Sequence, residues 1–496
     1  MFDNKLQGGI IYQIMPDRFF KKDSLSIIKE SDLKGRIIHN DFTEQVVWKP
    51  DEQGIIRNND FFGGNLAGIE SKIPYIADLG VSFIYLNPIF RAYSNHRYDT
   101  ANYLEIDPLL GTEEDFKSLC VEAKKFGIGI ILDGVFAHTG SDSLYFNKEN
   151  NYNEVGAYNS KQSRYYNWYK FRNYPDSYDS WWGFSTLPQT NQECKEYRDF
   201  ICNEVIPKWM NLGAAGFRLD VVDELKNYFI VEICNAIHSK GGFVIGEVWE
   251  NAATKCAYDE FKDYFDGNKL DSVMNYLWKD GIIDYVRYGT DFLKRQINEV
   301  LITYPKKVVN NLMNILSTHD IERAITAIAM PHLSGRDRNF QYDNHHIPCS
   351  EYDHSKRLLK LATVLQYFLP GVPSIYYGDE IGMSGYKDPF NRYPFAWDDI
   401  DRDLLLFFKE LGHIRCSNKF LAVADFELIY YDCNYVTFRR SYEEQNLFIC
   451  LNRSEYSIFE SRLQRGTLIY SNNDSRDGTT LAPFSFAIFT SPQGSL

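Results

Sequence analysis

Four short apolar runs of this sequence each end in an acidic residue, namely Asp133, Asp220, Glu247 and Asp320. A single acidic residue at a strand end usually caps the following helix or forms a structural ion pair. Four such residues at four separate strand ends are harder to explain in that way. Two neighbouring carboxyl groups, one ionised and one keeping its proton, can attack a carbon and protonate a leaving group. That division of labour is what cleavage of a glycosidic bond requires.

Two histidines and one arginine lie in the same stretches, at His138, His319 and Arg218. Because side chains alternate along a strand, Arg218 points to the same side as Asp220, two residues later. One interpretation is a structural ion pair. The other is an arginine that keeps Asp220 ionised and oriented, and the spacing alone leaves both open.

Eight β-rich runs separated by helical stretches must position these side chains. The runs are residues 10–14, 81–87, 129–135, 216–221, 243–248, 272–276, 314–320 and 373–378. Amphipathic segments between them, for example 113–126 and 223–239, indicate βα units around a parallel sheet. Eight units favour an α/β fold of the closed (β/α)8 TIM barrel type over an open doubly wound sheet. In such a barrel, catalytic groups lie at the carboxyl ends of the strands.

The spacing of the runs predicts two additions to the barrel. About eighty residues rich in Tyr, Asn, Ser and Trp separate the third and fourth runs, and a structureless loop of that length is uncommon. We therefore expect a subdomain inserted after strand 3, at 139–190, between barrel segments 1–138 and 191–404. From 405 to 496, an alternating β-branched and aromatic pattern predicts a C-terminal antiparallel β-sandwich.

Composition argues against several classes of protein. The chain has 496 residues and a formal net charge of −14, so its surface should repel nucleic-acid phosphates and anionic lipids. It has no apolar run approaching the ~18 residues of a membrane helix. Nine cysteines are scattered singly, and the first residues lack the basic and apolar stretches of a signal peptide. We expect a cytoplasmic protein with no nucleic-acid or membrane partner.

Longer segments of the chain resemble one enzyme family. They include Tyr12-Gln-Ile-Met-Pro-Asp-Arg-Phe, Phe62-Gly-Gly-Asn-Leu-Ala-Gly, Ser94-Asn-His-Arg-Tyr-Asp-Thr and Ile375-Tyr-Tyr-Gly-Asp-Glu-Ile-Gly. Together with the four strand ends, they resemble the α-amylase family, glycoside hydrolase family 13, over roughly residues 8 to 495. Ser272-Val-Met-Asn-Tyr and Ser317-Thr-His-Asp are most similar to its neopullulanase, cyclomaltodextrinase and amylopullulanase branches.

The resemblance implies a role for each matching residue. Asp220 matches the nucleophile, Glu247 the general acid/base and Asp320 a third carboxylate that grips sugar hydroxyls. The implied substrate-binding residues are Tyr98, Asp133, His138, Arg218, Glu224, Trp249, His319, Asp388 and Arg392. For Trp249, Glu224, Asp388 and Arg392, packing or surface ion pairing explains the residue about as well as sugar contact.

The implied reaction is a retaining double displacement, for which the carboxyl groups of Asp220 and Glu247 should lie ~5–5.5 Å apart. We expect a hydrolase of α-1,4 bonds in maltooligosaccharides, cyclodextrins or pullulan fragments, and the sequence leaves open whether it cleaves α-1,6 bonds as well. The alternatives are an α-1,6-glucosidase or transglycosylase of the same family, and a non-catalytic carbohydrate-binding or transporter-associated barrel. Since the chain starts at the barrel, without the amino-terminal dimerisation domain of many relatives, we expect a monomer.

The sequence predicts no required cofactor and no metal site. Ala137 stands where amylases commonly have an Asn ligand for Ca²⁺, and Lys21 and Lys22 stand in a segment that holds a second Ca²⁺ in relatives. Alanine offers no side-chain oxygen to this cation. The usual Ca²⁺ ligand positions are thus lost, although Ca²⁺ binding stays open. A separate cluster of His345, His346, Cys349 and His354 could ligate zinc or could be a polar, solvent-exposed loop.

Overall fold

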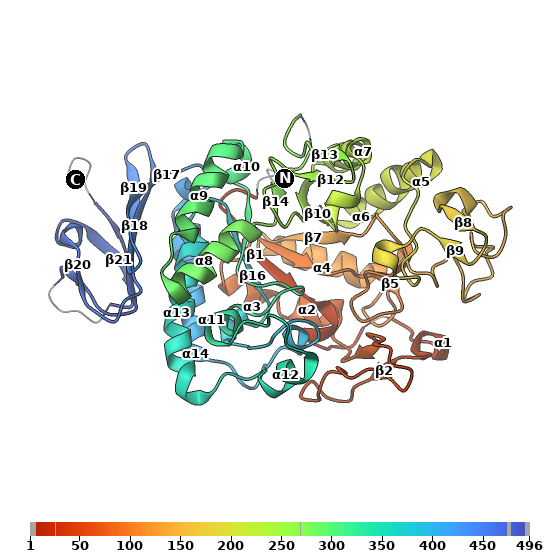
Figure 1. Ribbon diagram of the computed structural model, residues 1–496, viewed down its shortest axis with the longest axis horizontal. Helices are drawn as coiled ribbons and strands as arrows, with labels where there is room; N and C mark the ends of the chain where they lie inside the picture. The colour runs from red at the N-terminus through yellow and green to blue at the C-terminus, as the bar shows by residue number, and fades with distance from the viewer. Residues whose placement is uncertain (1–5, 25, 268, 474–477, 492–496) are drawn as a thin grey trace.

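Eight parallel strands form the centre of the computed structural model, which describes residues 6–24, 26–267, 269–473 and 478–491 (Figure 1). In chain order they are β1 (Ile11–Ile14), β4 (Phe83–Leu86), β7 (Gly129–Gly134), β10 (Ala214–Leu219), β11 (Phe243–Gly246), β14 (Ser272–Val273), β15 (Met313–Ile315) and β16 (Val372–Tyr376). The sheet order is β14-β11-β10-β7-β4-β1-β16-β15. A parallel bridge between Met274 and Met313 joins the two outer strands. The predicted (β/α)8 barrel is confirmed.

Helices stand between successive strands, and the longer ones cover the outside of the barrel. They are α1 (Glu30–Leu33), α2 (Leu66–Ser71), α3 (Ile73–Asp78), α4 (Glu113–Lys125), α5 (Lys195–Phe200), α6 (Ile206–Leu212), α7 (Asn227–His238), α8 (Tyr276–Tyr288), α9 (Phe292–Thr303), α10 (Lys306–Val309), α11 (Ala324–Ala329), α12 (Arg338–Asp343), α13 (Cys349–Phe368) and α14 (Arg402–Ser417). The two amphipathic segments singled out from the sequence form α4 and α7. Thr112 caps α4 by accepting the N–H of Asp115, which explains why that helix begins at Glu113.

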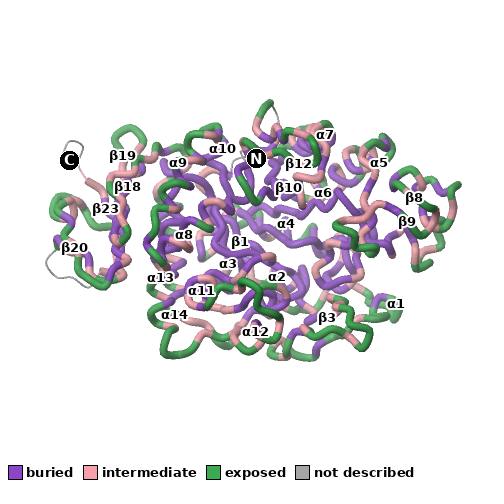
Figure 2. The backbone as a smooth tube through the Cα atoms, viewed as in Figure 1, coloured by how far each residue is buried: buried purple, intermediate pink, exposed green. Residues whose placement is uncertain are grey.

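The barrel strands are buried over almost their whole length, as Figure 2 shows for the centre of the molecule. Helices cover the outer face, and side chains such as Ile11, Tyr85 and Ile131 fill the interior. A strand with both faces buried needs a nearly continuous apolar sequence, which is why these runs are recognisable in the chain. Polar residues are therefore expected only where a strand ends or where they have a specific partner.

The segment between β7 and β10 is folded, and its core is aromatic. It contains the hairpin of β8 (Phe171–Asn173) and β9 (Ser177–Tyr178). Phe146 lies at the centre, with the rings of Tyr169 and Tyr178 at centroid distances of 4.8 and 4.7 Å. Ring packing of this kind accounts for the many aromatic residues between the third and fourth barrel strands. Figure 1 places β8 and β9 at one end of the long axis.

Several two-stranded sheets lie in the loops between the barrel strands. They are β2 (Ile37–Ile38) with β3 (Asp60–Phe61), β5 (Phe90–Ala92) with β6 (Thr100–Ile106), and β12 (Cys256–Ala257) with β13 (Glu260–Phe261). The β5–β6 pair precedes α4 and carries Tyr98 in its connecting turn. It therefore brings a predicted substrate-binding residue to the barrel mouth.

At the opposite end of the long axis lies an antiparallel sheet (Figure 1). Its order is β17 (Asp425–Tyr431), β18 (Tyr435–Tyr442), β19 (Gln445–Asn452), β23 (Ser485–Thr490) and β21 (Thr467–Ser471), beside a separate pair of β20 (Ile458–Phe459) and β22 (Thr480–Leu481). The pair packs against the large sheet through Leu481, which shares a buried apolar cluster with Phe448 and Phe489. The expected C-terminal antiparallel β-domain is therefore present, and its second layer has two short strands. Helix α14 runs across the expected start of this region at residue 405, and the sheet begins at Asp425.

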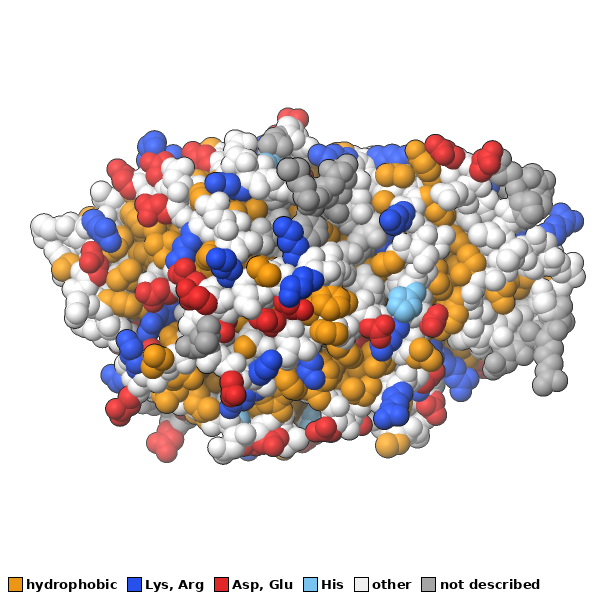
Figure 3. Space-filling view, turned by 180° about the vertical axis from the view of Figure 1, so that it is seen from behind, with side chains coloured by type: hydrophobic (Ala, Val, Ile, Leu, Met, Phe, Trp, Pro, Cys, Tyr) orange, Lys and Arg blue, Asp and Glu red, His pale blue; other side chains and the backbone are white. Residues whose placement is uncertain are grey.

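On the face drawn in Figure 3, Lys and Arg side chains are interspersed with Asp and Glu. No helix in the described part of the chain is long and apolar enough to cross a membrane. All nine cysteines lie in the described ranges, and each is a free thiol.

Candidate active site

Three of the predicted carboxylates lie at the carboxyl ends of neighbouring strands. Asp133 belongs to β7, while Asp220 and Glu247 directly follow β10 and β11. Val221 has a φ of 37°, a left-handed conformation that a β-branched residue rarely adopts. Its N–H donates to Oε2 of Glu247 over 2.9 Å. The strained turn after Asp220 therefore links two strand ends at the same edge of the barrel.

The buried guanidinium of Arg218 contacts all three of these carboxylates. Its Nη1 lies 2.9 Å from Oδ1 of Asp133 and 2.8 Å from Oδ1 of Asp220. Its Nη2 lies 2.9 Å from Oε2 of Glu247. The sequence left two interpretations of Arg218 open, and both apply. It is an ion-pair partner that also orients two candidate catalytic groups. Its charge is shared among three acids and does not serve Asp220 alone.

Asp320 joins the same network through an aromatic ring pair. Its Oδ2 lies 3.0 Å from Nε2 of His319, which also lies 2.7 Å from the hydroxyl of Tyr98. That hydroxyl donates to Oδ2 of Asp133 over 2.7 Å. The Tyr98 and His319 rings stack with centroids 5.3 Å apart. A continuous chain of contacts thus connects Asp320 to Asp133 and, through Arg218, to the other two carboxylates.

His319, the histidine in this chain of contacts, is held as the neutral ring. Burial lowers the pKa of His319 well below its usual value, and the guanidinium of Arg392 contributes. The side-chain amide nitrogen of Gln13 lies 2.9 Å from Nδ1, and an amide nitrogen can only donate. Nδ1 therefore accepts and the proton is on Nε2, which faces Tyr98 and Asp320. His319 is arranged to donate a hydrogen bond at the barrel mouth.

The carboxyl groups of Asp133, Asp220 and Asp320 have raised pKa values. Burial raises the pKa of Asp220 well above its usual range, and the carboxylates of Glu247 and Asp133 add to the rise against the opposing effect of Arg218. Burial and the Glu247 carboxylate raise the pKa of Asp320 to about 7, although 29% of its side chain is exposed at the mouth. Burial also raises the pKa of Asp133. The cluster can thus retain a proton near neutral pH.

Asp388 and Arg392 are part of this network and not of an isolated surface pair. Nη1 of Arg392 lies 3.1 Å from Oδ1 of Asp388, and its Nη2 lies 3.5 Å from Oδ1 of Asp320. Its Nε donates to the backbone oxygen of His319 over 2.9 Å. The segment after β16 therefore contributes a buried cation to one wall of the site.

Trp249 and His138 line other sides of the site. Nε1 of Trp249 donates to Oε1 of Glu247 over 3.2 Å, and its ring stacks on Tyr276 with centroids 4.0 Å apart. With 43% of its surface exposed, Trp249 offers its other parts to solvent or ligand. Nε2 of His138 lies 3.1 Å from the backbone oxygen of Tyr98, and burial lowers the pKa of His138 to about 4.

Glu224 has a set of partners of its own. Its side chain accepts hydrogen bonds from Nε1 of Trp182 at 3.2 Å and from the hydroxyl of Tyr258 at 3.0 Å. With Tyr258 and Gln189 it lines a small cavity of about 180 Å³. Trp182 is 78% exposed and has a φ of 50°. Gln189 also donates to Glu224 over 3.4 Å and forms a backbone bridge with His138. Glu224 thus holds aromatic side chains beside the site and is linked through Gln189 to one of the other predicted residues.

Sequence reasoning missed four residues that shape the site, namely Gln13, Tyr85, Asn87 and Tyr276. Gln13 fixes the tautomer of His319, and the Tyr85 hydroxyl donates to Oδ2 of Asp133 over 2.6 Å. Asn87 donates to the Tyr98 hydroxyl over 3.1 Å. A signal was present, since Gln13 and Tyr85 interrupt strands that are otherwise apolar. Such interruptions require a partner inside the barrel.

The residues present do not fit a Ca²⁺ ion after β7. Ala137 is buried, and the backbone oxygens of 135–138 already accept hydrogen bonds from the hydroxyls of Tyr103, Thr190 and Tyr197. These donors occupy carbonyl oxygens that a hard cation would need. Over residues 6–24, 26–267, 269–473 and 478–491, no three His, Cys, Asp or Glu side chains form a group able to hold a metal ion.

The cluster of His345, His346, Cys349 and His354 is mostly an exposed segment. His346, Cys349 and His354 are exposed, and His345 is half-buried against the ring of Tyr393. The four residues do not form a metal-binding group in the described structure.

A (β/α)8 barrel whose strand ends carry linked carboxylates, a buried arginine and an aromatic rim has the architecture of a glycosidase barrel. The family model described as the alpha amylase catalytic domain matches residues 13–404. The chain belongs to the α-amylase family, glycoside hydrolase family 13.

Similar proteins act on related sugars, as their names state. The chain is 34% identical to an amylopullulanase of Thermoanaerobacter thermohydrosulfuricus, covering 91% of this chain and 33% of that protein. It is 32% identical to neopullulanase 2 of Thermoactinomyces vulgaris, covering 90% and 69%. The chain thus spans about a third of the length of the amylopullulanases that it matches.

Solved structures show the same architecture. The type III pullulan hydrolase of Thermococcus kodakarensis superposes with a TM-score of 0.79 at 26% identity, covering 98% of this chain and 82% of that one. A cyclic α-maltosyl-(1→6)-maltose hydrolase of Arthrobacter globiformis gives 0.77 at 25% identity, covering 98% and 99%.

Proposed function

We propose that this chain is a retaining α-glucan hydrolase that cleaves α-1,4-glucosidic bonds in maltooligosaccharides, cyclodextrins or pullulan fragments. The observation that carries the proposal is the contact of Asp220 and Glu247 with the same guanidinium, in a network that also includes Asp320. The names of the relatives support α-glucan chemistry, since they specify pullulan and cyclomaltodextrin substrates.

In the proposed reaction, Glu247 protonates the glycosidic oxygen while Asp220 attacks the anomeric carbon. The product of this step is a covalent glycosyl-enzyme, and the leaving chain departs with the proton from Glu247. Glu247 then takes a proton from water, which attacks the same carbon and releases Asp220. Two inversions leave the product with the α configuration. The Nε2–H of His319 and the guanidinium of Arg392 are placed to bind hydroxyl groups of the glucose unit being cleaved.

Cleavage of α-1,6 bonds is the second specificity that we propose to test. Relatives named amylopullulanase and a hydrolase of a cyclic α-1,6-linked maltose dimer both have this architecture. An α-1,6-glucosidase or a transglycosylase of the same family would use the same carboxylates. A non-catalytic barrel is not favoured, because all three carboxylates are present and linked.

The proposal includes no required metal, a cytoplasmic location and a monomeric state. Nine free thiols and the absence of a disulfide among them support a reducing compartment. Fractionation of the source cells and sedimentation of the purified chain test location and oligomeric state directly.

The deciding experiment is a digest of maltoheptaose, β-cyclodextrin, pullulan and panose with the wild type and the D220N variant. We expect the wild type to release α-anomers, detected by proton NMR before mutarotation, and D220N to release none. Panose separates the bond types, because α-1,4 cleavage yields glucose and isomaltose whereas α-1,6 cleavage yields glucose and maltose. Initial β-anomers would contradict the retaining mechanism, and wild-type inactivity on all four sugars would overturn the proposed function.

A further inference from the structure

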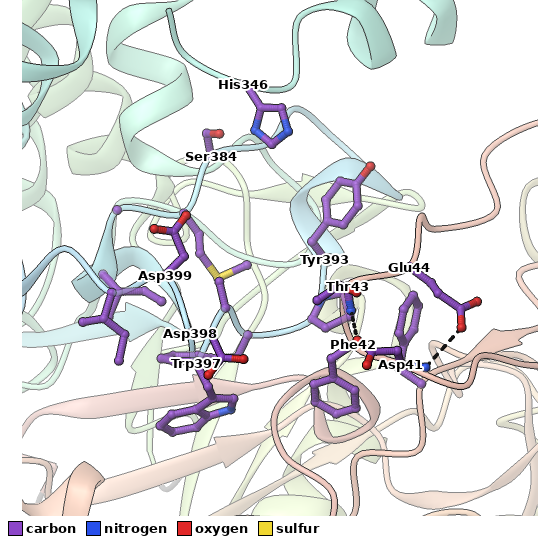
Figure 4. Close-up of a pocket in the computed structure, with 18 of the residues that line it drawn as sticks. Asp41, Phe42, Thr43, Glu44, His346, Ser384, Tyr393, Trp397, Asp398 and Asp399 are labelled. Atoms are coloured by element: carbon purple, nitrogen blue, oxygen red, sulfur yellow. Dashed lines mark hydrogen bonds between the residues drawn. The ribbon is translucent and has the colours of Figure 1, made fainter. Parts of the chain in front are cut away.

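A second cavity lies beside the proposed active site (Figure 4). Its volume is about 1060 Å³, and its walls come from the segment after β1, the segment after β16 and the connection that precedes α13. None of Asp220, Glu247 and Asp320 lines it. Both β1 and β16 lead into these segments at their carboxyl ends, so the cavity opens on the side of the barrel that carries the proposed catalytic groups.

The lining of this cavity combines aromatic rings with carboxylates. Figure 4 shows Phe42 and Trp397 on one side of the space, His346 on the opposite side, and Tyr393 facing Asp399 across it. The hydroxyl of Tyr393 donates to the side-chain oxygen of Gln45 over 2.8 Å, which holds the ring in place. Aromatic faces pack against apolar C–H groups, and carboxylates accept hydrogen bonds from hydroxyls.

The charges of the lining exclude anions. Asp398 and Asp399 are exposed, and no ion pair engages either of them in the described part of the chain. Asp41 and Glu44 add two carboxylates on the facing wall, whereas Lys21 is the one lysine of the lining. A neutral molecule rich in hydroxyl groups matches these walls, because it can donate to carboxylates and carries no charge of its own.

One dipeptide connects the two sites. Arg392 reaches Oδ1 of Asp320 at 3.5 Å in the proposed active site, and Tyr393, the next residue, lines the second cavity. The same Arg392 pairs with Asp388 at 3.1 Å, and neither of the two lines the cavity. A polymer held in the second cavity would therefore lie near the carboxylate of Asp320.

We propose that this cavity is a second α-glucan-binding site, which holds a segment of the same chain, or a branch of it, while another segment is cleaved. The proposal rests on the proposed function for the class of sugar, but it concerns residues outside the catalytic network. A volume of about 1060 Å³ is at the upper end of the range for ligand pockets, which is ample for a short oligosaccharide.

The experiment measures binding of maltotriose by calorimetry to the D220N variant, which should not consume it. We expect two binding sites per chain. Adding F42A and D399A should weaken one of them by at least ~10-fold, since the stacking face and the hydroxyl acceptor are both removed. The matched control Y456A removes an exposed aromatic ring from the C-terminal region and should leave both sites unchanged. Circular dichroism and the thermal midpoint verify that each variant is folded.

The two proposals fail in different ways. A single binding site in D220N, or two sites that F42A/D399A leaves unchanged, would overturn the second site without affecting hydrolysis by the wild type. Wild-type inactivity on every glucan would instead overturn the proposed function, whatever the number of binding sites. Displaceable binding of choline at Phe42 and Asp399 without binding of maltotriose there would assign the cavity to an organic cation and also overturn the second site.

Discussion

At the scale of single residues, the site is governed by one guanidinium shared among three carboxylates. Arg218 is fully buried and contacts Asp133, Asp220 and Glu247 within 2.9 Å. One positive charge cannot stabilise three ionised acids equally in a buried setting. The consequence is a cluster that keeps part of its protons, in which the acid and the nucleophile of the proposed reaction are adjacent.

The E247Q variant tests the role of Glu247 as proton donor. We expect kcat on maltotriose to fall by ~10²–10⁴-fold, the usual contribution of a general acid. Formation of the glycosyl-enzyme from a dinitrophenyl maltoside should be much less affected, because that leaving group needs no proton. Pre-steady-state release of dinitrophenol measures this step. The control is E250Q, which changes an exposed acid three residues after Glu247 that pairs with Lys255. An equal loss on both substrates would contradict the assignment.

The raised pKa of Asp220 predicts the acidic limb of the pH profile. A nucleophile must be ionised, so kcat/KM should fall as the pH drops through the raised pKa, well above the ~3.9 of an ordinary aspartate. The D133N variant removes a neighbouring negative charge, which lowers the pKa of Asp220 and should move the limb to lower pH. The exposed D199N variant should not move it. A wild-type limb near pH 4 would show that Asp220 is not perturbed.

At the scale of elements, the turns after the strands decide the chemistry more than the strands do. The left-handed turn at Val221 directs a backbone N–H at Glu247. The turn after β7 directs carbonyl oxygens at tyrosine and threonine hydroxyls instead of at a cation. The barrel thus has the carboxylates at its strand ends, while hydrogen bonds from hydroxyl groups stabilise the turn after β7 in place of a bound cation.

The hydroxyl-lined turn after β7 predicts stability without Ca²⁺. Dialysis against EDTA should change neither the rate of maltotriose hydrolysis nor the thermal midpoint, because hydroxyls already bind the carbonyls of 135–138. The Y197F variant removes one of two donors to the Phe136 oxygen, the other being Thr190, and should lower the free energy of unfolding by about 0.5–1.5 kcal/mol. A loss of activity in EDTA that added Ca²⁺ restores would contradict this account.

At the scale of the whole molecule, two buried arginines join the C-terminal sheet and the last helix to the barrel through hydrogen bonds to backbone oxygens. Arg440 of β18 donates to the backbone oxygens of Phe368 at 2.9 Å, Leu421 at 3.0 Å and Ala424 at 3.1 Å. Arg415 of α14 donates to the oxygen of Gly9 at 3.2 Å. Burial lowers the pKa of Arg440 to about 9 and that of Arg415 to about 10. These guanidiniums attach the C-terminal sheet and the last helix to the barrel.

The R440M variant tests that attachment. It leaves the carbonyls of Phe368, Leu421 and Ala424 buried without a donor, at a cost of about 1–3 kcal/mol for an unsatisfied group. We expect a lower urea midpoint, with the C-terminal sheet unfolding first by hydrogen exchange. Arg439 is the matched control, since its partly exposed ion pair with Glu427 should contribute only ~0–1 kcal/mol. Equal effects of R439M and R440M would contradict a specific role of Arg440.

The sequence by itself determined the barrel and its family. Eight apolar runs can be recognised in the sequence because strands buried on both faces tolerate few polar residues. The acidic residues at the ends of these runs can be recognised for the same reason. Asp220, Glu247, Asp320 and Arg218 could therefore be named in advance. The aromatic insertion was recognised as folded, although its ring packing around Phe146 was not foreseeable.

Only the tertiary structure decided how these side chains share charge and which neighbours complete them. Gln13 and Asp320 are more than 300 positions apart, so no local pattern shows that His319 lies between them. The partners of Glu224, the unequal layers of the C-terminal β-domain and the cavity beside Tyr393 depend on contacts between distant segments. The local periodicity of the sequence determines which face of a helix or strand is buried. The protonation of the carboxyl groups and the shape of the cavities depend on which helices, strands and loops come into contact in the folded protein.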